Sequence, residues 1–142
     1  METIIQDAQN NCPGFQSHVI FLGGNNLRDN FESVESFIEK CATLVKSFRD
    51  IPNSNLVFVS LIPSPRTHHK CRTTFQESNV RLEKLALEHP LHASFLDVND
   101  IFFNHGKINY QLFSDDRIHL VESGTRKVAH AISCHLKKIA CE

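Results

Sequence analysis

The sequence predicts an α/β fold in which strands and helices alternate along the chain. Three apolar runs of strand length, 18–22, 56–62 and 93–98, are separated by two stretches with helical periodicity. Continuous apolar runs of this kind are typical of parallel strands buried on both faces. We therefore expect three layers, with helices on both sides of a parallel sheet of about three strands.

Each helix is predicted by apolar residues that recur every three or four positions. The first long helix spans about 31–48, with Asn30 as the expected N-cap and Pro52 beyond its end. Its apolar face consists of Phe31, Val34, Phe37, Ile38, Cys41, Leu44, Val45 and Phe48. The second helix, 74–88, presents Phe75, Val80, Leu82, Leu85 and Ala86, and the last, about 123–140, presents Val128, Ala129, Ile132, Leu136 and Ile139.

The remaining segments are predicted from turn residues and polarity. Residues 2–11 read as a short polar helix and 63–72 as a polar loop. Residues 99–120 are predicted to be irregular, anchored to the core by four aromatic residues: Phe102, Phe103, Tyr110 and Phe113.

Composition narrows the class of protein. The chain has 142 residues, 41% of them hydrophobic, which suits one domain with a packed core. A formal charge of −1, from 15 basic and 16 acidic residues, argues against nucleic acid as a partner. No apolar run has the length of a membrane helix, and the first residues do not resemble a signal peptide. We expect a soluble, cytoplasmic protein that has no membrane partner.

The cysteines and histidines predict neither a disulfide framework nor a metal centre. The five cysteines are an odd number and include no CxxC pair, so reduced thiols are expected. The nearest approach to a zinc motif is His68, His69 and Cys71, which lack the second ligand pair of a structural zinc site. We expect a polar loop there, and no metal or other cofactor.

Two polar clusters lie where chemistry gathers in parallel sheets, beyond the carboxyl ends of the strands. Gly23-Gly24-Asn25-Asn26 directly follows the first strand, and an asparagine there could donate its amide N–H to a ligand oxygen. Asp115-Asp116-Arg117-Ile118-His119 precedes the last helix, and an aspartate three residues before a histidine can hold one ring nitrogen. Each cluster by itself is also compatible with an ordinary turn or a solvated loop.

Taken together and in this order, the clusters resemble the SGNH (GDSL-type) hydrolases. Gly23-Gly24-Asn25-Asn26 matches the G-x-N-D block with asparagine as its last residue, and Asp116-Arg117-Ile118-His119 matches the D-x-x-H block. Further matches are Ser60-Leu61-Ile62-Pro63, Asn79, Phe95-Leu96-Asp97 with Phe102 or Phe103, and Gly124. The resemblance covers most of the chain from about residue 18, and it implies a flavodoxin-like SGNH-hydrolase fold.

The resemblance also implies roles for individual residues. His119 would be the general base, and Asp116 would orient it; the neighbouring Asp115 is a less well-spaced candidate for the same role. Asn25 would donate its amide to the oxyanion of an ester intermediate, in an oxyanion hole that includes Gly24. The substrate would be a small-molecule acyl or acetyl ester.

The blocks that carry the serine nucleophile and a second oxyanion donor have no match in this sequence. Ser17 enters the first strand at its amino end and Ser60 belongs to another strand, so neither is assigned as the nucleophile. We expect residues 1–142 to form a single SGNH-like domain that lacks the first two strands of the family and is incomplete or inactive as a catalyst. The alternatives are a non-catalytic binding or assembly module and an unrelated α/β domain.

The missing strands imply an exposed sheet edge at 18–22. An unpaired apolar edge is a template for association. We expect it to be covered by residues 1–14, by a second copy of the chain, or by a strand of another polypeptide.

Overall fold

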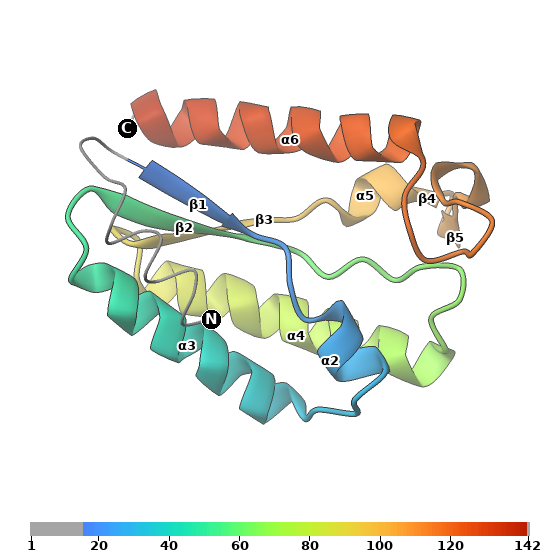
Figure 1. The fold of residues 1–142 in the computed structure, drawn as a ribbon, viewed down its shortest axis with the longest axis horizontal. Helices are drawn as coiled ribbons and strands as arrows, with labels where there is room; N and C mark the ends of the chain where they lie inside the picture. The colour runs from blue at the N-terminus through green and yellow to red at the C-terminus, as the bar shows by residue number, and fades with distance from the viewer. Residues whose placement is uncertain (1–15, 142) are drawn as a thin grey trace.

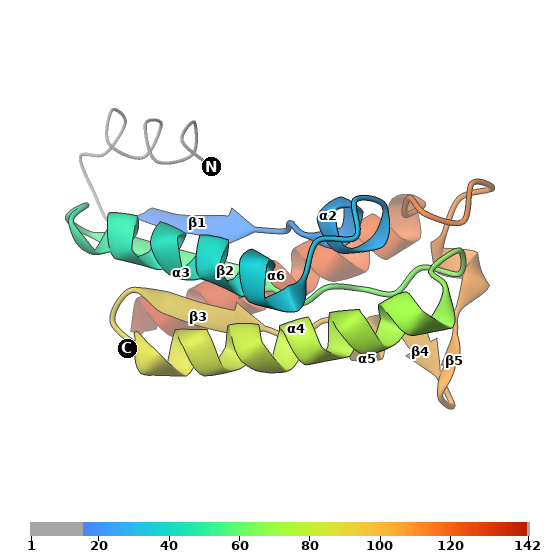
Figure 2. The same ribbon diagram turned by 90° about the horizontal axis from the view of Figure 1, so that it is seen from below.

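The structure is a computed structural model that describes residues 16–141. In these residues a parallel sheet with the strand order β1-β2-β3 lies between two layers of helices (Figure 1). The strands are β1 (Gln16–Ile20), β2 (Ser54–Val59) and β3 (Ala93–Leu96). Helices α3 (Val34–Arg49) and α4 (His69–Glu88) cover one face, and α6 (Glu122–Cys141) crosses the other (Figure 2). The predicted α/β class is confirmed, while the helix predicted at 2–11 lies outside the described residues.

β2 is the central strand, and all six of its residues are buried. Leu56 and Phe58 belong to the core that includes α3 and α4 side chains, whereas Val59 belongs to the core beneath α6. Alternate side chains of a strand point to opposite faces, so a strand covered by helices on both sides must be apolar at successive positions. The parallel pairing aligns Phe58 with Ile20 of β1 and Phe95 of β3.

The strands end earlier than the apolar runs predict. β1 stops at Ile20, and the next two residues, Phe21 and Leu22, are 50% and 48% exposed. Within the described residues β1 pairs with β2 alone, so its other side is an edge of the sheet. The structure places this exposed edge at residues 16–20. The expectation that another segment or chain covers it stays a prediction.

Helix α3 begins at Val34, three residues later than predicted. Its N-cap is Ser33, whose Oγ accepts a hydrogen bond from Ser36 N at 3.1 Å, so the prediction of Asn30 was wrong. Phe31 lies in the preceding turn with a φ of 51° and is 84% exposed. α3 starts late because an additional short helix, α2 (Gly24–Arg28), precedes it. A hydrogen bond from Glu32 N to Asn26 O closes the turn between the two helices, and Phe31 lies in this turn.

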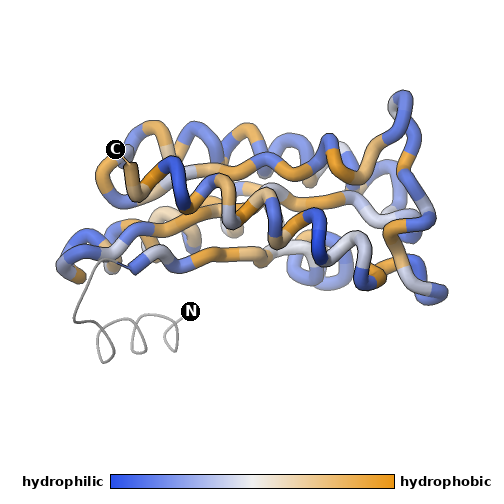
Figure 3. Tube along the Cα trace, turned by 90° about the horizontal axis from the view of Figure 1, so that it is seen from above, coloured by the Kyte–Doolittle hydropathy of each residue, from blue (hydrophilic) through white to orange (hydrophobic). Residues whose placement is uncertain are grey.

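Helices α4 and α6 largely follow their predicted periodicity. α4 begins five residues earlier than predicted, with His68 as its cap, which shortens the polar loop. Val80 is 66% exposed and lies outside the buried face of α4. On α6, Val128 is buried, three further predicted positions are half-buried, and Ala129 is exposed instead. Figure 3 shows hydrophobic and hydrophilic residues alternating along α6, as expected for a helix with one covered face.

The segment predicted to be irregular contains several short elements. These are α5 (Asn99–Phe102), β4 (Phe103–Asn104), β5 (Lys107–Ile108) and the 3-10 helix η1 (Tyr110–Leu112). The rings of Phe102 and Phe113 lie 5.5 Å apart in the core beneath α6 and anchor the segment as expected. Tyr110 is 59% exposed and is not an anchor.

No helix in the described part of the chain is long and apolar enough to span a membrane. Residues 16–141 also contain no group of three histidine, cysteine, aspartate or glutamate side chains placed to hold a metal ion. Among the cysteines that the structure describes, Cys41 is buried, and burial raises the pKa of its thiol to about 12. Cys134 and Cys141 are exposed thiols.

The chain beyond β2 is held in place by the side chain of Asn79 on α4. Asn79 Oδ1 accepts a hydrogen bond from Leu61 N at 2.7 Å, and Nδ2 donates one to Leu61 O at 3.0 Å. Leu61 is buried, so water cannot readily replace these partners. The amide of Asn79 therefore fixes the path of the chain where it leaves the sheet.

We expect Asn79→Ala to lower the free energy of unfolding by about 1–3 kcal/mol, because it leaves the buried Leu61 N–H without a partner, whereas Leu61 O keeps the bond from Asn99 Nδ2 at 3.3 Å. Urea denaturation of the full chain measures this change. Gln76→Ala, an exposed position on the same helix, is the matched control and should change stability by less than about 0.5 kcal/mol. Equal effects of the two substitutions would contradict this role of Asn79.

Candidate active site

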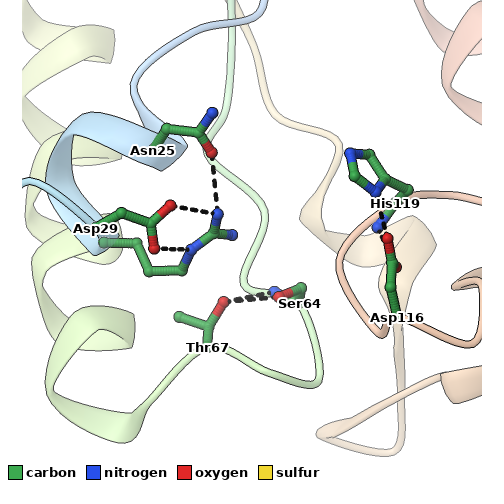
Figure 4. A network of polar contacts seen from close by, with 7 residues as sticks. Asn25, Asp29, Ser64, Thr67, Asp116 and His119 are labelled. Carbon is green, nitrogen blue, oxygen red and sulfur yellow. Dashed lines mark hydrogen bonds and ion pairs between the residues drawn. The ribbon is translucent and has the colours of Figure 1, made fainter.

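A cavity of about 400 Å³ opens beyond the carboxyl ends of β1 and β2. The turn after β1 forms one wall, and the loop before α6 forms another (Figure 4). The lining residues are Phe21, Leu22, Gly23, Gly24, Asn25, Asn26, Leu61, Ile62, Phe75, Phe113, Ile118, His119 and Leu120. The fold thus brings Gly24, Asn25 and His119 to one cavity. Parallel strands end on the same side of the sheet; Gly24 and Asn25 follow β1, and His119 belongs to the longer segment between β3 and α6.

Asp116 and His119 form a hydrogen-bonded pair. His119 Nδ1 contacts Asp116 Oδ2, and the other ring nitrogen lies on the side that faces Asn25 (Figure 4). An ionised carboxylate only accepts hydrogen bonds, so the proton belongs to Nδ1 and the lone pair to Nε2. The His119 side chain is 80% exposed, so Nε2 can be reached from the cavity.

The second carboxylate oxygen of Asp116 organises the loop. Oδ1 accepts hydrogen bonds from Ser114 Oγ at 2.7 Å, Ile118 N at 2.8 Å and His119 N at 2.9 Å. The bond with the His119 side chain and these three donors stabilise the carboxylate and hold its pKa well below the ordinary range. Of the two candidate aspartates, Asp116 is the one that contacts His119.

The loop that carries the pair is closed by backbone hydrogen bonds. Ser114 N donates to His119 O and Arg117 N donates to Ser114 O, both at 2.8 Å. Arg117 adopts a φ of 60°, which allows the tight turn between Asp116 and His119. Gly124, at the start of α6, packs so closely on η1 that a Cβ there would lie 2.7 Å from Leu112 O.

Asn25 belongs to the short helix α2, which the sequence analysis did not predict. The helix starts directly after Gly23, which has a φ of 104° and lies against Phe37 of α3. Asn25 is exposed at the cavity, and its Oδ1 accepts a hydrogen bond from Arg28 Nη2 at 2.9 Å. The structure therefore places the amide opposite His119, as Figure 4 shows.

The two glycines before Asn25 differ in whether the structure would tolerate a side chain at their position. A Cβ on Gly23 would lie 2.6 Å from the ring of Phe37, whereas one on Gly24 would have no atom within 4 Å. Gly24 lines the cavity, and its place in an oxyanion hole stays a prediction, but Gly23 is the residue that must be glycine for α2 to form here. The sequence contains this signal only as a pair of adjacent glycines, and it does not distinguish between them.

None of the described residues that line the cavity carries a hydroxyl or thiol group. Ser60 is buried, and its Oγ accepts hydrogen bonds from Val98 N at 2.9 Å and Asn99 Nδ2 at 3.1 Å. Ser64 is also buried, with its Oγ 2.9 Å from Thr67 Oγ1. The hydroxyl groups of these two serines are thus engaged by Val98, Asn99 and Thr67, and the residues that line the cavity supply a base and an amide donor.

The described residues have part of the SGNH-hydrolase fold, with its parallel sheet and flanking helices. No model of a protein family and no curated protein sequence matches the chain. Solved structures do match it over most of its length, and the following three are esterases.

The first is a carbohydrate esterase of family 3 from Talaromyces cellulolyticus, with a TM-score of 0.75 and 16% identity. The second is a mutant acetyl esterase determined with acetate, with a TM-score of 0.70 and 16% identity. The third is an acetylxylan esterase from Geobacillus stearothermophilus, a catalytic mutant in which a histidine is replaced by alanine, with a TM-score of 0.62 and 12% identity. The matches cover 96%, 95% and 92% of this chain but only 63%, 66% and 64% of those proteins.

Proposed function

We propose that this chain is an ester-hydrolase domain of the SGNH type that acts on acyl or acetyl esters. The observation that carries the proposal is the meeting of Asn25 and His119 at one cavity, with Asp116 bonded to the far side of the imidazole. A base oriented by a carboxylate and an amide donor opposite it are two of the groups that enzymatic ester cleavage uses. The esterases that share the fold, among them an acetyl esterase and an acetylxylan esterase, support the choice of substrate class.

The chemistry follows from the geometry of these side chains. With an ester carbonyl beside Asn25 Nδ2, His119 Nε2 removes the proton from the attacking hydroxyl group or water. The tetrahedral intermediate places its negative oxygen at the Asn25 amide, and Asp116 stabilises the imidazolium that has formed. His119 then returns the proton to the departing alcohol as the carbon–oxygen bond breaks.

Because the described cavity wall lacks a hydroxyl or thiol group, water is the nucleophile that these residues can activate. Loss of a catalytic serine lowers kcat by about 10⁶-fold in a serine hydrolase, so turnover by this site is slow. The apolar wall, which includes Phe21, Leu22 and Phe75, also favours a second candidate function, the binding of an acylated ligand without hydrolysis.

Hydrolysis of p-nitrophenyl acetate by the full chain tests the proposal. We expect slow turnover without an initial burst, because no acyl-enzyme forms, and a loss of roughly 100-fold in His119→Ala. His130→Ala removes an exposed histidine from the middle of α6 and should leave the rate unchanged.

Equal rates for the wild type and His119→Ala would contradict the hydrolase assignment. Ester-induced changes in the NMR signals of Asn25 and His119, without any hydrolysis, would instead favour the binding function.

A further inference from the structure

The side chain of Arg28 lies directly behind the Asn25 amide. Its Nη2 donates a hydrogen bond to Asn25 Oδ1 at 2.9 Å, while Nε and Nη2 donate to the two carboxylate oxygens of Asp29 at 2.8 Å each. Only 16% of the Arg28 side chain is exposed, against 53% for Asp29. The guanidinium is therefore held in a partly buried fork between an amide and a carboxylate.

This contact determines which end of the amide faces the cavity. The oxygen and nitrogen of an asparagine amide are nearly equal in size, so a flip about the last torsion angle costs little unless a partner distinguishes them. A guanidinium has only donors, so it must face Oδ1 and leave Nδ2 on the opposite side. Of these two atoms, only Nδ2 can donate to an oxyanion; Oδ1 would repel it.

We propose that Arg28 is a positioning residue that holds the Asn25 amide with its N–H donors toward the cavity. The inference rests on the proposed function and adds a residue to it that the family resemblance did not supply. Preorganised donors are effective in catalysis because no orientation has to be imposed as the charge develops.

Asp29 holds the Arg28 side chain in position. Its bidentate contact places the guanidinium plane, and the mutual hydrogen bonds raise the pKa of Arg28 and lower that of Asp29. Asn25 and Arg28 are three residues apart on α2, the spacing at which helical side chains are neighbours. A five-residue helix thus carries both the donor and the group that orients it.

A purely structural role for Arg28 would give a different pattern of effects. If the arginine only stabilised α2, its loss would disturb the whole helix and the substrate affinity. If it orients the amide, its loss would free the Asn25 side chain, leave the α2 backbone in place and lower kcat more than it changes KM.

The experiment compares Arg28→Met and Arg28→Lys with the wild-type full chain. The matched control is Arg81→Met, which removes an arginine that binds two carboxylates, Glu35 and Glu77, away from the site. In Arg28→Met we expect the Asn25 side-chain amide to become mobile in ¹⁵N relaxation, with the backbone signals of α2 retained. With p-nitrophenyl acetate we expect kcat to fall about 10-fold to 100-fold at nearly constant KM.

Arg28→Lys keeps a donor and should partly restore both readouts, whereas Arg81→Met should change neither. An Asn25 amide that stays ordered in Arg28→Met, or loss of the α2 backbone signals, would overturn the proposal. The ester-hydrolase assignment itself is tested by the hydrolysis rate of His119→Ala. A hydrolysis rate unaffected by that substitution would refute the function, while the relaxation data would still show whether Arg28 orders the amide.

Discussion

Gly23→Ala is expected to lower the free energy of unfolding by about 2–4 kcal/mol, because a strained backbone and an overpacked contact act together. The φ of 104° at Gly23 is one that residues with a Cβ rarely adopt, and the added carbon would lie 2.6 Å from the Phe37 ring. Phe37, a residue of α3, is buried in the hydrophobic core that α3 and α4 form with the sheet, so its ring has little room to move. Urea denaturation of the full chain measures the loss.

Gly24→Ala is the matched control for stability. Gly24 is the first residue of α2, and a Cβ there would meet no atom within 4 Å. Alanine is the better helix former, so the free energy of unfolding should stay unchanged or rise by up to about 1 kcal/mol. Equal stability of Gly23→Ala and Gly24→Ala would contradict the claim that the turn packs closely against Phe37.

Asp116→Asn is expected to reverse the tautomer of His119 and so lower ester turnover by roughly 100-fold or more. In the wild type, Asp116 Oδ1 accepts three donors from the loop, and Oδ2 accepts the Nδ1 proton. An amide at this position must keep its oxygen toward the three donors. Its NH₂ group then takes the place of Oδ2 and donates to Nδ1, which moves the ring proton to Nε2.

The ¹⁵N chemical shifts of the His119 ring distinguish the two tautomers directly. We expect an Nδ1–H form in the wild type and an Nε2–H form in Asp116→Asn. Asp115→Asn, the neighbouring position that does not bind the ring, should keep the wild-type tautomer. An unchanged tautomer in Asp116→Asn would contradict the proposed orientation of the base.

The same carboxylate gives this prediction a defined pH dependence. Because the pKa of Asp116 is lowered in the folded protein, its charge stabilises the fold above the unfolded-state pKa of about 3.9. This contribution is lost as the pH falls through the lower, folded-state pKa. The difference in stability between the wild type and Asp116→Asn should therefore narrow as the pH falls below about 4. Acid titrations of both proteins, followed by circular dichroism, measure it.

Much of the fold could be predicted from the sequence because helices cover both faces of the sheet. That arrangement makes β2 apolar at successive positions from Leu56 to Val59 and gives α3 a continuous apolar face, and both patterns are visible without coordinates. The predictions failed where tertiary contacts override local preference. Phe31 fits the periodicity of α3, yet the turn behind α2 excludes it from the helix.

The sequence by itself determined the parallel α/β class, the order of the two polar clusters and the spacing of Asp116 and His119, since each depends on residues close together in the chain. Only the tertiary structure decided that Asn25 and His119 meet at one cavity, that Gly23 is the constrained glycine, and that Arg28 lies behind the amide. The physical reason is that these features depend on how parallel strands place their loops at a common end and on how closely Phe37 packs there. Neither feature can be predicted from the local pattern of residues.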